Sequence, residues 1–335
     1  MTPLLEVRDL RIAFDTEAGR LVAADGVSFE VAPGGALGIV GESGSGKSVT
    51  SLAVMGLQRG AEVSGEVVFE GRDLLALSEP EMRHVRGNEI AMVFQDPLSS
   101  LHPLKRVGAQ VAEAVRAHRP VSRAAARARV LELLTLVELR DPPRVARAYP
   151  HELSGGMRQR AMIAVALANE PRLLLADEPT TALDVTVQAQ ILALLGRLRE
   201  ELGMALVIVT HDLGVIAATA ERVAVMYAGR IVERAPAATI FRAPEHPYTW
   251  GLLRSVPRLD TPRDAPLMAI EGSPPSPLAR PAGCSFHPRC PYVRDAHRRV
   301  DPPLEPAEGD PAHEVACLLP ARTRRELWAK AWEDR

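Results

Sequence analysis

The sequence is poor in cysteine and in lysine, and each shortage excludes a class of protein. Three cysteines in 335 residues are too few for a disulfide-stabilised secreted domain and suit a reducing cytosol. Lysine occurs only at positions 47, 105 and 330, so arginine supplies nearly all of the 40 basic residues. Acidic residues number 42, which leaves a net charge of −2 and no overall basic field. Nucleic acid is therefore not an expected partner.

Long hydrophobic runs are missing as well. The longest apolar run, residues 161–168, is far shorter than the roughly 18 residues that suggest a membrane-spanning helix. Charges at Glu6, Arg8 and Asp9 make the N-terminal stretch unlike a signal peptide. Hydrophobic residues still make up 47% of the chain, which is enough for a buried core. We expect a folded protein that reaches a membrane only through partners.

Apolar runs and helical patterns alternate along most of the chain, which favours an α/β fold with a largely parallel sheet. A helical block from about residue 98 looks like a subdomain inserted into this pattern. Half of the 28 prolines lie after residue 256, where strand and helix periodicity fades. We predict a main domain at 1–256 with a helical subdomain at about 98–168, and a small loop-rich domain at 257–335. Strands are expected at 4–14, 27–41, 65–71, 90–95, 172–177 and 204–210, and a pair of strands that turns at Gly229 is expected at 222–233. Helices are expected at 46–57, 107–118, 121–137, 157–168, 185–202 and 212–220.

A phosphate-binding motif follows the apolar stretch "ALGIV". Residues 41–48, "GESGSGKS", match the P-loop pattern between a strand and a helix. Glycines let backbone N–H groups surround phosphate oxygens, and the helix N-terminus adds positive potential. Lys47 is expected to contact the β- and γ-phosphates, and the Ser48 hydroxyl to bind Mg²⁺.

A pair of acids ends another apolar strand, "RLLLADE". Asp177 is expected to reach Mg²⁺ from the carboxyl edge of the sheet. Glu178 can polarise a water for attack on the γ-phosphate. The alternative for Glu178 is a helix-capping acid.

The stretch "LSGGMRQR" suggests a second anion site. Ser154 is a strong helix N-cap, and Gly155 and Gly156 expose backbone N–H groups at a positive helix end. One nucleotide does not need two such sites in one chain. Two chains arranged head to tail would each lend this site to the other's nucleotide.

Taken in order, these motifs resemble the nucleotide-binding subunit of an ATP-binding cassette (ABC) transporter. The resemblance covers about residues 4–256 and implies a P-loop NTPase cassette with a mixed sheet that binds ATP and Mg²⁺. It implies that Gln95 contacts Mg²⁺ and the attacking water, that His211 holds the γ-phosphate, and that Asp184, in "ALD" at 182–184, lies at a dimer seam. Phe14 lies where the family places an aromatic ring against adenine, although core packing is an open alternative. The implied nucleotide-binding set is Phe14, Gly41, Ser43, Gly44, Gly46, Lys47, Ser48, Val49, Gln95, Ser154, Gly155, Gly156, Asp177 and Asp184, with Ser48, Gln95 and Asp177 at Mg²⁺ and with Glu178, His211 and Gln95 catalytic.

Further stretches, such as "HPYTWGLLRSVP" and "GCSFHPRCPY", resemble the oligopeptide/dipeptide permease branch of that family. The resemblance implies peptide import, with substrate delivered by an extracytoplasmic binding protein. Implied partners are a paralogous second ATPase subunit, in a heterodimer, and two membrane permeases at the cytoplasmic face of the inner membrane. Alternatives are import of a related ligand, such as nickel or glutathione, and a soluble non-transport ABC ATPase.

The cysteines all lie in the C-terminal region. The family's full pattern there has four cysteines, which hold a 4Fe–4S cluster in some members. In this sequence the four positions are Cys284, Cys290, His297 and Cys317, so a histidine takes the place of one cysteine. A Cys₃His cluster, a structural zinc site and unliganded thiols are all open. His287 or His313 could also supply the fourth ligand.

Overall fold

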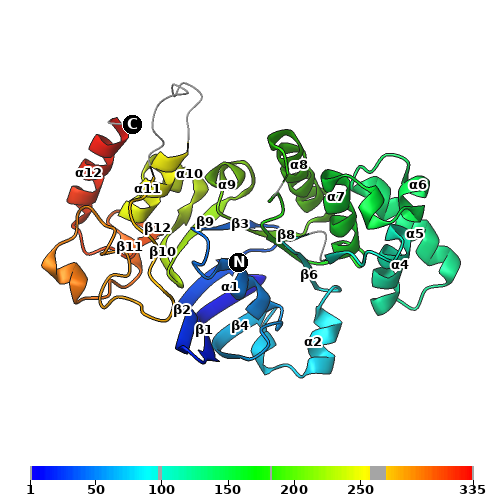
Figure 1. The fold of residues 1–335 in the computed structure, drawn as a ribbon, viewed down its shortest axis with the longest axis horizontal. Coiled ribbons are helices and arrows are strands. Elements are labelled where there is room, and N and C mark those ends of the chain that lie inside the picture. The colour runs from blue at the N-terminus through cyan, green and yellow to red at the C-terminus, as the bar shows by residue number, and fades with distance from the viewer. Residues whose placement is uncertain (1, 97–99, 182, 257–268, 334–335) are drawn as a thin grey trace. The chain divides into compact units, whose positions relative to one another are not determined.

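A computed structural model describes residues 2–96, 100–181, 183–256 and 269–333 (Figure 1). The chain divides into two compact units. The first unit holds Met1–Leu5, Val31–Ala36 and Phe69–Val209, and the second holds Glu6–Glu30, Leu37–Val68 and Thr210–Arg335. In the described part of the chain, no helix is long and apolar enough to cross a membrane.

Parallel strands form the centre of the first unit. β6 (Ile90–Val93) pairs with β7 (Leu173–Asp177), which pairs with β8 (Ala205–Thr210). Every residue of these strands is buried, as expected for a parallel sheet that is covered on both faces. The carboxyl ends of such strands deliver side chains to one edge of the sheet.

α7 packs on β6, and several helices of the unit pack on one another. α4, α5 and α6 contact each other, and α7 contacts α4 and α5. This is the helical block that the sequence predicts, although residues 97–99 at its start lie outside the described residues. The elements of the unit are α2 (Glu79–Val85), α4 (Val107–His118), α5 (Arg123–Leu136), α6 (Pro142–Arg147), α7 (Gly155–Ala166), α8 (Val185–Leu202), the short strand β5 (Arg72–Asp73), and the 3-10 turns η1 (Leu74–Ala76) and η2 (Pro150–Glu152).

The second unit holds the phosphate-binding motif. β3 (Ala36–Val40) is fully buried and pairs in parallel with β9 (Arg222–Tyr227). α1 (Lys47–Val54) follows the motif, as predicted. β9 and β10 (Arg230–Pro236) form the predicted antiparallel pair, with a turn at Gly229. A separate sheet contains β2 (Gly19–Val31), β1 (Leu5–Thr16) and β4 (Ala61–Phe69), in that order, and the helices include α9 (Leu213–Thr219), α10 (Ala237–Arg242) and α11 (Pro247–Ser255).

The C-terminal region adds strands that the sequence did not indicate. β11 (Glu305–Ala307) and β12 (Asp310–Val315) form an antiparallel pair, and β12 also pairs with β10. α12 (Ala321–Glu333) packs against α11, with the rings of Trp250 and Trp328 6.2 Å apart (Figure 1). The 3-10 turn η3 (Asp295–Arg298) lies between them in sequence. The predicted domain boundary at 256/257 stays a prediction, because residues 257–268 lie outside the described residues.

Candidate nucleotide site

The phosphate loop is a close-packed turn between β3 and α1. Gly46 precedes the helix with a φ of +100°, and a Cβ there would lie 2.4 Å from the carbonyl oxygen of Ala23. At Gly41 a Cβ would lie 2.1 Å from the carbonyl oxygen of Met226. Neither position has room for a side chain. Packing therefore requires glycine at these two positions of the motif.

Lys47 lies folded over this loop. It is only 4% exposed, and its ammonium group donates hydrogen bonds to the carbonyl oxygens of Gly41 and Glu42, each at 2.8 Å. Ser48 and Val49 follow at the start of α1 and are half-buried, while Ser43 and Gly44 are exposed. The loop thus holds a cation at its centre and opens backbone groups to solvent beside it. This combination suits a phosphate chain.

The first unit brings two predicted catalytic residues together. The Gln95 side chain, just after β6, donates a hydrogen bond to Oε2 of Glu178 at 2.9 Å. The Thr181 hydroxyl donates to the same oxygen at 2.8 Å. Glu178 has a φ of +45°, which a non-glycine residue rarely adopts, and its amide donates to the carbonyl of Val209. Neither the contact from Thr181 nor this backbone conformation is predicted from the sequence.

Asp177 is the last residue of β7 and lies opposite Val209 of β8. It is buried, at the carboxyl end of a strand, as its predicted role requires. His211 directly follows β8 and is exposed. Phe14 lies half-buried near the end of β1. The adenine-stacking role of Phe14 and the γ-phosphate role of His211 stay predictions.

The signature stretch starts a helix in the predicted way. The Ser154 hydroxyl accepts a hydrogen bond from the amide of Met157 at the N-terminus of α7. Ser154 and Gly155 are exposed. A Cβ on Gly156 would lie 2.6 Å from Val187 in α8, so a larger residue there would push α7 and α8 apart. Asp184 caps α8 by accepting a hydrogen bond from the Val187 amide at 3.0 Å, and Ala182 lies outside the described residues.

The C-terminal cysteines are not arranged as a metal site among the described residues. All three are free thiols, and burial raises the pKa of Cys290 to about 12 and that of Cys317 to about 11. Burial also raises the pKa of the Cys284 thiol. His297 is buried, its Nδ1 is directed at the backbone of Arg294, and its Nε2 makes no hydrogen bond within the described residues. No three Cys, His, Asp or Glu side chains of the described residues are grouped to hold a metal ion. The predicted iron–sulfur cluster and the zinc alternative thus find no support.

Together the fold and these loops define an ATPase built on a phosphate-binding loop. The family model described as "ABC transporter" matches residues 24–181, and the one described as "Oligopeptide/dipeptide transporter, C-terminal region" matches residues 232–296. The chain belongs to the ABC transporter family, as one of its ATP-binding proteins.

Curated relatives match nearly the whole chain. The chain is 54% identical over 317 residues to the "Probable peptide ABC transporter ATP-binding protein y4tR" of Sinorhizobium fredii, covering 94% of each chain. It is 51% identical over 307 residues to the "Oligopeptide transport ATP-binding protein OppD" of Bacillus subtilis, covering 91% of this chain and 86% of that protein.

Solved structures agree with the fold. The ATP-binding cassette MJ0796, in a dimeric post-hydrolysis state bound to ADP and phosphate, matches with a TM-score of 0.64 at 31% identity. The match covers 70% of this chain and 98% of that one. CbiO1 from Clostridium perfringens, part of the ABC transporter complex CbiONQ, matches with a TM-score of 0.62 at 26% identity, covering 72% of this chain.

Proposed function

We propose that this chain binds and hydrolyses ATP to power the import of di- and oligopeptides through an ABC transporter. The observation that carries this proposal is the likeness over 94% of the chain to a peptide ABC transporter ATP-binding protein. The match to the oligopeptide/dipeptide C-terminal region, at residues 232–296, supports the same branch. The site geometry supports the ATPase chemistry.

ATP supplies the phosphates for the loop at residues 41–48. The donor set of Ser48, Gln95 and Asp177 offers hydroxyl, amide and carboxylate oxygens, which are the ligands that Mg²⁺ prefers. These residues would hold the ion, and its charge would neutralise the phosphate oxygens when bound. Lys47 adds its own positive charge at the centre of the loop.

Glu178 is the general base of the proposed hydrolysis. Hydrogen bonds from Gln95 and Thr181 fix its Oε2, and so orient the carboxylate. The carboxylate takes a proton from water while the water oxygen attacks the γ-phosphorus. The bond from the γ-phosphorus to the β–γ bridging oxygen breaks, and ADP and phosphate are formed. His211 contacts the γ-phosphate in this proposal.

A second ATPase subunit completes the site. The exposed N-terminus of α7, at Ser154 to Gly156, faces the partner's nucleotide in this proposal, and Asp184 lies at the seam. We expect that partner to be a paralogue. Two membrane permeases anchor the pair at the cytoplasmic face of the inner membrane, and an extracytoplasmic binding protein delivers peptide.

The direct test is reconstitution of the chain with these partners in vesicles. Peptide added with the binding protein should raise ATP hydrolysis and drive uptake of labelled peptide. Stimulation by nickel or glutathione, and not by peptide, would contradict peptide import. An ATPase that never associates with permeases would contradict the transporter role.

Glu178→Gln tests the base assignment in an assembly whose partner site is inactive. The variant should bind ATP normally but hydrolyse it at least roughly 100-fold more slowly, because the amide cannot accept the proton. Glu138→Gln is the matched control, since Glu138 also has a positive φ but contacts Arg160 in the helical block. Hydrolysis by Glu178→Gln at the control's rate would refute the assignment.

A further inference from the structure

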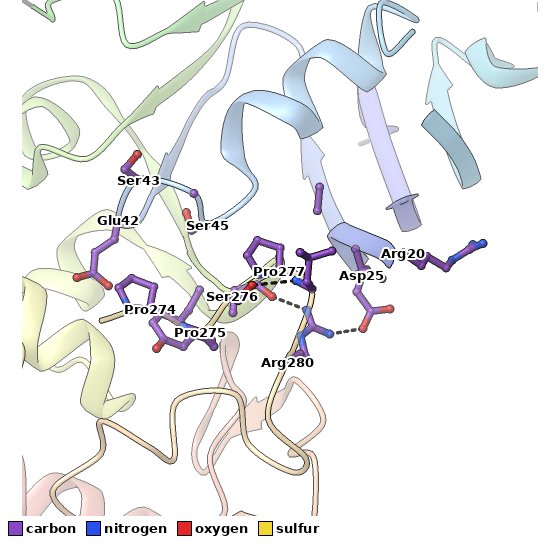
Figure 2. Close-up of a pocket in the computed structure, with 17 residues that line it drawn as sticks. Arg20, Asp25, Glu42, Ser43, Ser45, Pro274, Pro275, Ser276, Pro277 and Arg280 are labelled. Carbon is purple, nitrogen blue, oxygen red and sulfur yellow. Dashed lines mark hydrogen bonds and ion pairs between the residues drawn. The ribbon is translucent and has the colours of Figure 1, made fainter. Parts of the chain in front are cut away.

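A segment of the C-terminal region lies against the phosphate loop within the second unit. A pocket of about 280 Å³ is lined by Glu42 to Ser45 of the loop, by Val22 and Ala23 of β2, and by the stretch Pro274–Leu278 (Figure 2). Figure 2 shows Pro274, Pro275 and Ser276 beside the loop residues. Segments more than 200 residues apart in sequence thus share one pocket.

Arg289 connects this segment to the loop itself. Its guanidinium donates to both carboxylate oxygens of Glu42, at 2.6 and 3.0 Å. The Arg289 side chain is 3% exposed, and its remaining bonds go to the carbonyl oxygens of Glu271 and Ile270. A partly buried bidentate ion pair whose arginine also donates to two backbone carbonyls is a rigid connection.

Glu42 is also held through its backbone. Its amide donates to the hydroxyl of Tyr248, which is fully buried, at 2.8 Å. Its carbonyl accepts the bond from Lys47 at 2.8 Å. Arg289, Glu42 and Lys47 therefore form a connected chain that runs from the C-terminal region to the cation of the phosphate loop. A shift of Glu42 would move an acceptor of Lys47.

A second anchor fixes the far side of the pocket. Arg280 donates to the carboxylate of Asp25 at 2.5 Å and also to the carbonyl oxygen of Ala228 (Figure 2). The amide of Val22 donates to the carbonyl of Pro277 at 3.4 Å. These bonds connect the stretch Pro274–Leu278, together with Arg280, to β2 and to the turn between β9 and β10.

We propose that residues 270–289 contribute to the ATP site in two ways. Arg289 is a positioning residue that fixes the phosphate loop through Glu42. The stretch Pro274–Leu278 is one wall of the pocket that receives the ribose and base of ATP. The proposal rests on ATP binding at residues 41–48. An apolar proline-rich wall contacts a nucleoside without reading its hydrogen-bonding groups, so ATP and GTP should be affected alike.

Two ligands separate the roles: ATP carries a nucleoside, and tripolyphosphate does not. Both are titrated against the full chain by calorimetry. Leu278→Ser should weaken ATP roughly 5-fold and leave tripolyphosphate unchanged, because only the apolar wall is altered. Val300→Ser is the control, since Val300 is 48% exposed, Leu278 is 42% exposed, and Val300 does not line the pocket. Equal affinities for ATP in both variants would refute the proposal that Pro274–Leu278 forms one wall of the ATP pocket.

Arg289→Gln should weaken ATP and tripolyphosphate alike, by roughly 10-fold or more, because the loop loses a charged bidentate contact. The affinity of Arg289→Lys for both ligands should lie between those of the wild type and Arg289→Gln, since lysine keeps the charge but not the bidentate geometry. Glu42→Gln should resemble Arg289→Gln, and the double variant should be no weaker than either single one. Arg222→Gln is the control, because Arg222 bonds the carbonyl of Ala312 in the C-terminal region.

Circular dichroism establishes that each variant is folded before titration. Unchanged affinities in folded Arg289→Lys and Glu42→Gln chains, or additive losses in the double variant, would overturn the positioning role. A wild-type chain that binds neither ligand would instead refute ATP binding itself. The two failures are therefore distinguishable.

Discussion

The two loops of this chain that we propose to bind anions are built in opposite ways. The loop at residues 41–48 is closed: Lys47 is 4% exposed and bonded to loop carbonyls, and two glycines touch neighbouring backbone. The stretch at residues 153–156 is open: Ser154 and Gly155 are exposed at the start of α7. One loop carries its own cation, while the other offers only a helix N-terminus and a hydroxyl.

This contrast indicates which loop binds ATP without help. Backbone dipoles at a helix end contribute less than a full charge, and solvent and salt screen them when they are exposed. A single chain should therefore bind nucleotide through residues 41–48 alone. The exposed stretch should matter only where a second chain covers it and excludes water.

The largest expected effect comes from removing the charge of the closed loop. Lys47→Ala should weaken ATP binding by the single chain at least roughly 100-fold, because an ion pair to phosphate is lost in a largely buried setting. Calorimetric titration measures this. Lys105→Ala is a matched control, since Lys105 pairs with Glu113 on the surface. Normal ATP affinity in Lys47→Ala would mean that the loop does not hold the phosphates.

Ser154→Ala tests the open loop, with a smaller expected effect. ATP binding by the single chain should stay unchanged, while hydrolysis by the assembled pair should fall roughly 10-fold as one contact to the partner's phosphate is lost. Ser122→Ala is the control, because Ser122 caps α5 through the Ala125 amide just as Ser154 caps α7. Both changes should cost about 1 kcal/mol of stability.

An equal fall in hydrolysis for Ser154→Ala and Ser122→Ala would assign the loss to helix capping. A loss of ATP binding by the single Ser154→Ala chain would contradict the expectation that a single chain binds ATP through residues 41–48 alone.

The same contrast explains what the sequence could predict. The phosphate loop, the two acids at the end of β7 and the serine cap of α7 are short contiguous stretches, so each can be recognised within a few positions of the sequence. Their elements appear where the sequence predicts them. The sequence predicts that Gln95 and Glu178 both belong to the site, but it does not predict the hydrogen bond between them.

The sequence did not predict contacts between residues that are far apart along the chain. Arg289 and Glu42 are 247 positions apart in the sequence. Arg289 lies in a proline-rich stretch, and the composition of such a stretch is typical of a solvated loop. β11 and β12 were missed because prolines within them interrupt the alternating pattern. The cysteine spacing suggested a ligand set only through resemblance, since spacing along the chain does not fix the distances between thiols.

The smallest predicted effect concerns the contact between the C-terminal strands and β10. His313 on β12 lies 2.7 Å from Oε1 of the fully buried Glu233, which also accepts from the amide of Glu245 at 2.5 Å. Burial opposes the charged imidazole, but the bond to Glu233 outweighs it, and the charges of Glu245 and Asp310 act in the same direction, so the pKa of His313 is raised.

A raised pKa in the folded state stabilises the protein at pH values below the ordinary histidine pKa, and this stability is lost as the pH rises through the folded value. The free energy of unfolding should fall by about 1 kcal/mol between pH 6 and pH 8.5 through this contact. His313→Gln should lack that part of the slope, whereas His84→Gln, at an exposed position, should keep it. Urea denaturation at a series of pH values measures the slope.

Identical slopes for His313→Gln and the wild type would show that the Glu233 contact does not depend on a charged imidazole. The attachment of β12 to β10 would then rest on backbone pairing and on the ion pair between Arg234 and Glu314.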